Sequence, residues 1–285
     1  MPQHSRPTTA SPALGTGPAG TESGWPVLHL FLGVDRSRWR GLSPGDRGAA
    51  VEEFSGLLSR VRGEEGLQLI ATGVIGKADL GLMVIHPDLG RVQRFTQEVA
   101  ATALGSCLET RYSFLSVSEK SEYISTTGDH ARKLLDEDRL DPASPEFQQQ
   151  VAGFSRRMSA YADSRLHPKL PGGEYPVLCF YPMSKARGEA RNWYALSFSE
   201  RKRLMGSHAE AGRRFADRVT QLITSSTGLD DWEWGVTLFT RDLKAIRDIV
   251  YEMRYDEGSA LYGQFGPFYV GVRFEPADLR DALQL

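Results

Sequence analysis

A single histidine, His208, occupies a position from which it could bind a metal ion. It falls in an apolar stripe at helical spacing, four residues after Leu204 and three before Ala211. The predicted helix runs from Ser199 to about Val219 and points the imidazole inward. An inward imidazole can ligate a metal, or it can be a core residue that forms ordinary hydrogen bonds. The surrounding sequence has to decide between these two roles.

The helix that carries His208 has a clear predicted start. Ser197 and Glu200 have the spacing of a capping box, in which each side chain satisfies a free backbone N–H at the helix N-terminus. An apolar strand at 176–181 precedes this helix and ends at Tyr181. Because Pro182 follows, Tyr181 is held in an extended conformation, and by itself its ring could simply line the core.

The order of predicted elements indicates the fold class. In the first half we expect helices at 49–61 and 89–104 and strands at 26–34, 67–75, 80–86 and 110–117. In the second half we expect helices at 199–219 and 242–254 and strands at 176–181, 219–226, 231–240 and 268–274. Both halves have the order β-α-β-β-α-β. We therefore predict an α+β protein in which two tandem ferredoxin-like modules form a dimeric-type α+β barrel.

The two modules are expected to be separated by a connector. The predicted divisions are a disordered tail at 1–24, an N-terminal module at 25–118, a helical connector at 119–172 and a C-terminal module at 173–285. The connector contains a helix with Ser144 as N-cap and Pro145 at the first helical position. We expect its apolar stripe to be buried packing, formed by Phe147, Val151, Phe154, Met158 and Tyr161.

Composition restricts the classes of partner. The 34 basic and 36 acidic residues are mixed along the chain, so we expect neither a nucleic acid nor an anionic membrane as a partner. No apolar stretch has the length of a membrane span or of a signal peptide. Cys107 and Cys179 lack the spacing of a zinc site, and we expect both to be buried thiols in a reducing compartment, the cytoplasm.

Several segments on both sides of His208 resemble one family when taken together. They are Tyr-Pro-Met-Ser-Lys-Ala-Arg at 181–187, Gln221, the segment 227–239, Tyr-Glu-Met-Arg-Tyr-Asp-Glu at 251–257 and Phe-Gly-Pro-Phe-Tyr-Val-Gly at 265–271. In order and spacing the last hundred or so residues closely resemble the coproheme decarboxylases of the chlorite dismutase family. The likeness is looser before Gly173. Leu261 departs from the pattern, because the family usually has an arginine there.

The resemblance implies a site for iron coproporphyrin III (coproheme), in which His208 ligates the iron and the opposite face stays open to a small oxidant. Gln221 follows His208 by 13 residues, which is about 220° around an uninterrupted helix, so the two cannot share a face. If the chain turns into a strand between them, Gln221 can reach the distal side, where the resemblance places a glutamine or a substitute for it. The alternative is a strand amide that bonds to the backbone.

A porphyrin with four propionates needs cations and hydroxyls around its edge. The resemblance assigns residues to the propionate-binding or catalytic shell, with Tyr181 and Lys185 as the catalytic pair and Met183, Arg254 and Ser259 as binding residues. Arg213 is a further candidate, although Arg214 adjoins it and only one of the two can face inward. Each lysine or arginine alone could equally be a solvated surface residue.

The implied activity is the hydrogen peroxide-dependent oxidative decarboxylation of coproheme to haem b, a step of haem biosynthesis. In this reaction Tyr181 would pass one oxidising equivalent to a nearby propionate, and loss of carbon dioxide would leave a vinyl group. Relatives that split chlorite carry a distal arginine, so the neutral Gln221 argues against that reaction. The resemblance also implies a homopentamer and a transient contact with coproporphyrin ferrochelatase. The alternatives are a haem-binding carrier or sensor without turnover, and a relative with chlorite dismutase or peroxidase activity.

Overall fold

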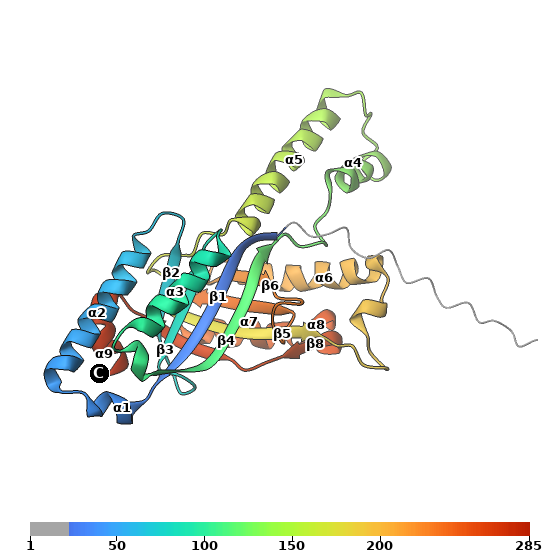
Figure 1. Cartoon of the computed structure of the whole chain (residues 1–285). Coiled ribbons are helices and arrows are strands. Elements are labelled where there is room, and N and C mark those ends of the chain that lie inside the picture. The colour runs from blue at the N-terminus through green and yellow to red at the C-terminus, as the bar shows by residue number, and fades with distance from the viewer. Residues whose placement is uncertain (1–22) are drawn as a thin grey trace, which may run out of the picture.

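The strands form one antiparallel sheet that closes on itself. The structure is a computed structural model that describes residues 23–285 (Figure 1). The first module supplies β1 (Ser23–Val34), β2 (Gln68–Val74), β3 (Leu80–Ile85) and β4 (Leu108–Glu119). The second supplies β5 (Val177–Lys185), β6 (Val219–Ser225), β7 (Trp234–Thr240) and β9 (Tyr269–Arg273), and the short β8 (Gly263–Phe265) adds to β5.

The order of the strands confirms the predicted α+β class and the ferredoxin-like modules. Around the ring it is β7-β6-β4-β1-β3-β2-β9-β5, and β5 pairs back with β7. Each module therefore has the same internal order, in which its first and third strands are central. The modules join through β4–β6 and β2–β9, which are shorter ladders than those within a module. Closure in this way leaves neither module with a long free edge.

Helices pack against the outside of the ring at two places. The helices of the first half are α1 (Arg36–Gly41), α2 (Pro44–Arg62) and α3 (Leu89–Ala101), and α9 (Leu279–Leu283) returns to pack with them. The second half has α6 (Phe198–Arg213), α7 (Leu243–Met253) and α8 (Glu257–Tyr262). Between the halves lie α4 (Thr127–Asp136) and α5 (Pro145–Leu166). The second module thus has its own core between sheet and helices, to which Phe215, Leu238 and Ile249 contribute.

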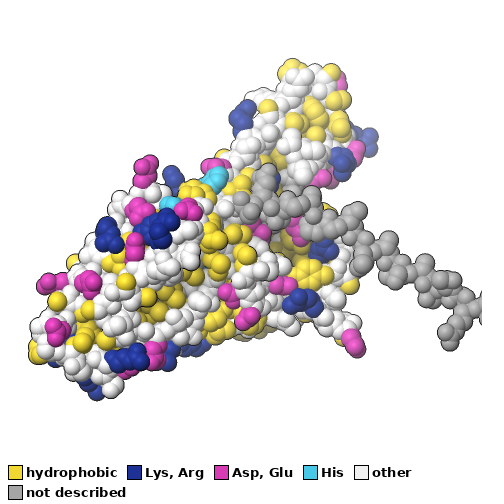
Figure 2. Space-filling view, viewed as in Figure 1, with side chains coloured by type: hydrophobic (Ala, Val, Ile, Leu, Met, Phe, Trp, Pro, Cys, Tyr) yellow, Lys and Arg dark blue, Asp and Glu magenta, His cyan; other side chains and the backbone are white. Residues whose placement is uncertain are grey.

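The connector differs most from the sequence prediction. Its helix starts as predicted, because the Ser144 hydroxyl accepts a hydrogen bond from the Phe147 N–H, but no residue of α5 is buried. Tyr161, expected in the buried stripe, is 41% exposed. The prediction of a buried stripe was therefore wrong within a single chain. The helices α4 and α5 project from the barrel as an arm and mainly contact each other, so the barrel does not cover the stripe. Figure 2 shows hydrophobic side chains on the surface of this arm.

The observed boundaries of other elements also differ from the predicted ones. The helix that carries His208 ends at Arg213 rather than near Val219, because the chain turns and Val219 pairs with Thr240 at the start of β6. Only half of the predicted capping box forms: the Ser197 hydroxyl accepts from the Glu200 N–H, while the Glu200 carboxylate binds Arg203. β1 begins at Ser23, so the predicted tail of residues 1–24 otherwise lies outside the described residues.

The predicted cysteine environment is confirmed. Cys107 and Cys179 are free thiols and both are buried, and burial raises the pKa of the Cys179 thiol to about 12. Among residues 23–285, no helix has both the length and the apolar character that a membrane crossing requires. The same residues contain no cluster of three or more histidine, cysteine or acidic side chains that could hold a metal ion.

His29 lies in the interior of the barrel, where it should make the fold sensitive to acid. His29 is 2% exposed, its Nε2 lies 2.8 Å from the Thr237 hydroxyl, and its ring stacks on Phe180. Burial lowers the pKa of His29 from 6.5 to about 3. The unfolded chain thus binds a proton below pH 6.5 that the folded chain excludes, so this residue lowers stability as pH falls from about 6.5 towards 3.

We predict that His29→Leu flattens the loss of stability in acid. The contribution of His29 to that loss is on the order of 4–5 kcal/mol near pH 3 and vanishes above pH 6.5, where the imidazole is neutral in both states. Denaturant unfolding from pH 7.5 to pH 4 checks this, with the difference between variant and parent plotted against pH. A difference that stays constant over this range would mean that His29 does not carry the effect.

Candidate functional site

The first feature of the site is a hydrogen-bonded pair, His208 and Asp256, between α6 and the start of α8. His208 lies on α6, and its Nδ1 is 3.0 Å from Oδ2 of Asp256, a carboxylate that caps the N-terminus of α8. The side chain of Asp256 is only 2% exposed. Burial alone would raise the pKa of Asp256, but the hydrogen bond and charge of His208 and the Ser259 N–H together hold it below its usual value.

This pair determines which nitrogen of His208 can ligate a metal. An ionised carboxylate only accepts hydrogen bonds, so in the neutral imidazole the proton sits on Nδ1 and the lone pair is on Nε2. Within residues 23–285, Nε2 has no hydrogen-bond partner, and the His208 side chain keeps 24% of its surface exposed. The imidazole is thus oriented and free at the atom that a metal would bind.

Ser259 lies beside the Nδ1 atom of this imidazole. Its N–H donates to Asp256 Oδ2 at 3.0 Å, and its hydroxyl lies 3.3 Å from His208 Nδ1. The three side chains come together because α8 follows α7 in a tight turn and packs on α6. The sequence prediction included His208 and Ser259 but missed Asp256. The sequence feature that could have identified Asp256 is an aspartate three residues before a serine at the start of a short helix, which is the spacing of an N-cap.

Tyr181 and Lys185 lie on the same face of β5, because strand residues four apart point to one side. The Tyr181 ring stacks on Phe268 with centroids 4.4 Å apart, and its hydroxyl has no hydrogen-bond partner in the described part of the chain. Burial raises the pKa of Tyr181 well above its usual value, so the phenol is neutral. Met183, between the two, packs against the core of the second module.

Lys185 is a buried cation at the end of β5. It is 5% exposed, and its Nζ lies 4.3 Å from the centroid of the Trp193 ring and 3.5 Å from the Gly258 carbonyl oxygen. Desolvation lowers its pKa to about 8, although the charges of Asp256 and Glu233 oppose this. Trp193 and Glu233 were missed from sequence, because a tryptophan in a loop and an acid before a strand carry no periodic signal.

Arg254 lies where α7 ends, next to a cavity of about 440 Å³ that runs along this helix. Its guanidinium lies 3.8 Å from the centroid of the Phe265 ring, and Phe268, which stacks on Tyr181, also lines the cavity. The cavity is otherwise mostly apolar, with Ile246 and Val250 in its wall. This places an exposed cation beside a mostly apolar cavity that shares one wall residue, Phe268, with the packing of the Tyr181 ring.

Gln221 and Arg213 occupy different environments. Gln221 lies on β6, after the turn that ends α6, and its Nε2 is 3.6 Å from where a Cβ of Gly212 would be. It therefore lies under the C-terminal end of α6, which is the arrangement expected if a strand follows the helix. Arg213 is exposed, and neither an ion pair nor a side-chain hydrogen bond engages it within residues 23–285. Within the described residues, neither a hydrogen bond nor an ion pair joins the Arg213 side chain to the other site residues.

Comparison with known proteins identifies several similar chains. A family model described as chlorite dismutase matches residues 47–274. A protein of Natronomonas pharaonis whose name proposes haem binding is 37% identical over 266 residues, which cover 92% of this chain and 41% of the relative. A similarly named protein of Halobacterium salinarum is 40% identical over 266 residues, with 91% and 49% covered. The chain thus spans less than half the length of these relatives.

Solved structures of similar proteins are also known. A haem-binding protein from Thermus thermophilus has a TM-score of 0.77 at 37% identity, with 94% of this chain and 99% of that chain covered. A chlorite dismutase from Candidatus Nitrospira defluvii in complex with imidazole has a TM-score of 0.68 at 23% identity, with 93% and 97% covered. The second likeness concerns the fold alone.

Proposed function

Because the chain belongs to the chlorite dismutase family, we propose that it is a peroxide-dependent enzyme that decarboxylates coproheme to haem b at the site between α6, α7 and the second half of the barrel. The observation that carries the proposal is Tyr181, a half-buried neutral phenol whose hydroxyl has no hydrogen-bond partner within the described residues, on the same strand face as the buried cation Lys185. A protein that only stores or carries haem has no need of an oxidisable phenol in that place.

The donor set fits an iron porphyrin. His208 would ligate the iron through Nε2, and Asp256 would hold the imidazole in place and increase its basicity. Met183 and the apolar wall of α7 would contact the macrocycle, and Lys185, Arg254 and Ser259 would lie near its carboxylates. Haem binding by the Thermus thermophilus relative supports this assignment. Arg213 fits less well, because it is exposed and its side chain forms no hydrogen bond or ion pair with the others among residues 23–285.

The bound iron porphyrin supplies the oxidising chemistry with peroxide, and the protein directs it to the propionates. For each propionate that becomes a vinyl group, one peroxide and one proton are consumed and one carbon dioxide and two waters are released. Tyr181 would give up its hydroxyl hydrogen atom and recover one from the propionate side chain. Lys185, whose pKa of about 8 leaves it mainly protonated at neutral pH, would hold the carboxylate and could supply the proton.

A direct assay separates this proposal from its alternatives. Purified full-length protein would be mixed with iron coproporphyrin III and given peroxide in small portions, and the porphyrin masses would be followed. Two successive losses of carbon dioxide support the decarboxylase. Stable binding of haem b with no change in coproheme mass would instead favour a carrier or sensor, which the names of the curated relatives also allow. Light scattering would test the expected homopentamer, and pull-down would test the contact with coproporphyrin ferrochelatase.

We predict that Asp256→Asn weakens the bond between His208 and iron. The amide cannot offer the negative charge that polarises Nδ1–H, so the iron–histidine stretching frequency of the ferrous complex should fall. The affinity for the iron porphyrin should drop by roughly 10- to 100-fold. Resonance Raman spectroscopy measures the first effect and titration the second. Glu257→Gln removes a neighbouring exposed carboxylate that pairs with Arg203 and serves as the control. An unchanged frequency in Asp256→Asn would contradict this role.

We predict negligible oxygen release from chlorite. Gln221 lies under α6 beside Gly212, and its neutral amide cannot supply the fixed positive charge that would hold an oxyanion on the iron. Gln221→Arg should restore little of this activity, because the remaining side chains are arranged for a carboxylate-rich porphyrin. An oxygen electrode measures the rate with the reconstituted protein. Rapid oxygen evolution by the parent would overturn the decarboxylase in favour of chlorite dismutation.

A further inference from the structure

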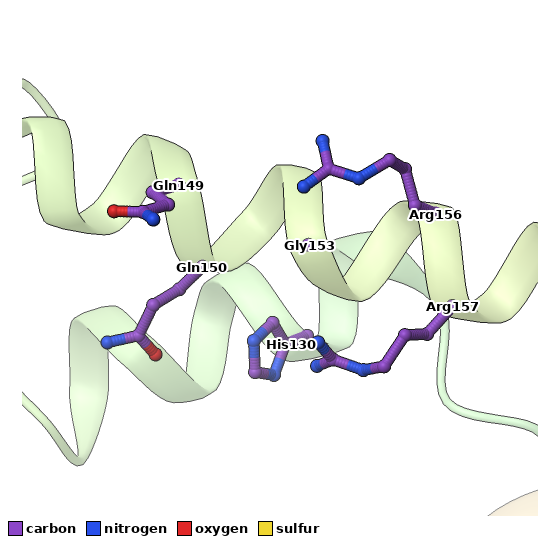
Figure 3. Close-up of a pocket in the computed structure, with 6 residues that line it drawn as sticks. All are labelled: His130, Gln149, Gln150, Gly153, Arg156 and Arg157. Carbon is purple, nitrogen blue, oxygen red and sulfur yellow. The ribbon is translucent and has the colours of Figure 1, made fainter.

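A second pocket lies on the arm formed by α4 and α5. It has a volume of about 450 Å³ and is lined by His130 from α4 and by Gln149, Gln150, Gly153, Arg156 and Arg157 from α5 (Figure 3). A volume in this range accommodates small organic ligands. None of its residues belongs to the site described above, so the pocket has no part in the proposed reaction.

The pocket is built around a glycine. On a helix surface the neighbours of a residue are those three and four positions away, which for Gly153 are Gln149, Gln150, Arg156 and Arg157. Every one of these neighbours carries hydrogen-bond donors, and the central position has no side chain. Glycine is a poor helix former, so Gly153 in the middle of a 22-residue helix lowers the stability of that helix relative to alanine. A Cβ at Gly153 would lie 3.5 Å from Arg157 Nη1, so a longer side chain would fill the pocket.

The pocket is positively charged and has no acidic residue in its lining. Within residues 23–285, Arg156 and Arg157 form no ion pair, whereas Arg132 and Lys133 on the same arm pair with Asp129 and Glu137. The His130 ring stacks on Phe154 with centroids 4.3 Å apart. Figure 3 shows Arg157 extending from α5 towards His130 on α4. Arg157 and His130 thus bring donors from both helices to one space, and the carboxylate next to it, that of Glu146, accepts a hydrogen bond from Gln150 Nε2 at 3.4 Å.

The geometry points to a binding site on the α4–α5 arm for a small anion that carries at least two phosphate or carboxylate groups. The two guanidinium groups supply planar, paired N–H donors that match such oxyanions, and the Gln149 amide supplies a further N–H group. Two cations from adjacent helix positions, together with a pocket of this volume, accommodate an anion with more than one charged group better than a single inorganic ion. Phosphate and carboxylate ligands share this chemistry.

Calorimetric titration of the full chain at low ionic strength tests the site, with pyrophosphate in one arm and citrate in the other. We expect saturable binding of at least one of them at one site per chain, weakened by added salt. The double change Arg156→Gln with Arg157→Gln should weaken it by roughly tenfold or more. Gly153→Leu should do the same without any change of charge. Arg132→Gln removes an exposed arginine outside the pocket and should leave binding unchanged.

The outcomes distinguish the source of the oxyanion and can overturn the site. Tighter binding of pyrophosphate identifies a phosphate ligand, and tighter binding of citrate identifies a carboxylate ligand. The absence of saturable binding of either anion refutes the site, as does binding that survives both the double arginine change and Gly153→Leu. Thermal unfolding of each variant, with and without the anion, shows whether the arm still folds. The test requires no porphyrin, so its result is independent of the proposed function.

Discussion

Tyr181→Phe should bind coproheme almost normally and yet form almost no haem b. The change removes one hydroxyl that makes no hydrogen bond within the described residues, and it keeps the ring that stacks on Phe268, so folding should be nearly unaffected. Loss of one hydrogen bond to a propionate costs at most roughly 1.5 to 3 kcal/mol. Turnover needs more than binding, because phenylalanine has no hydroxyl hydrogen atom to give up. We therefore expect porphyrin bleaching by peroxide in place of decarboxylation.

The measurement for Tyr181→Phe is a mass analysis of the porphyrin after incubation with a small excess of peroxide. Coproheme, the three-propionate intermediate and haem b are resolved in each sample. Tyr161→Phe is a matched control, because Tyr161 lies on the α4–α5 arm and is 41% exposed. It should retain the parent rate. If Tyr181→Phe forms haem b at close to that rate, the phenol has no role in the reaction. A small change in affinity alone would favour the carrier.

His208→Ala should abolish the ordered five-coordinate ferric spectrum of the complex. Other histidines of the described chain, such as His29 in the barrel and His130 on the arm, are held elsewhere and cannot replace it. The porphyrin can still bind through Lys185 and Arg254, although more weakly. Free imidazole added to the variant should enter the vacated space and restore much of the parent spectrum, because Asp256 remains to accept its N–H.

Absorption and electron paramagnetic resonance spectra of the ferric complex check the His208→Ala prediction. His86→Ala changes a histidine of the first module, which bonds to the backbone of Asp88, and should leave both spectra unaltered. Removal of His208 leaves the Asp256 carboxylate buried without its partner, which costs about 1–3 kcal/mol, so thermal unfolding must accompany the spectra. An unchanged Soret band in a folded His208→Ala protein would remove His208 from the site.

The sequence alone determined the two modules and most of the elements that carry the site. Alternation at period two and apolar stripes at period 3.6 are local properties, so the order of residues was enough to locate β5, α6, β6 and α7. The spacing that places Tyr181 and Lys185 on one strand face is local in the same sense. The resemblance then supplied His208, Gln221, Arg254 and Ser259 by their order along the chain.

Only the tertiary structure decided which side chains meet. Asp256 reaches His208 across 48 residues because α8 folds back onto α6, and no periodicity in the sequence encodes that contact. Closure of the barrel through β4–β6 and β2–β9 likewise depends on pairings between distant strands. The burial of the apolar stripe on α5 was predicted wrongly for a related reason. Periodicity shows that a helix has an apolar face, but burial depends on what packs against that face, and the arm projects away from the barrel.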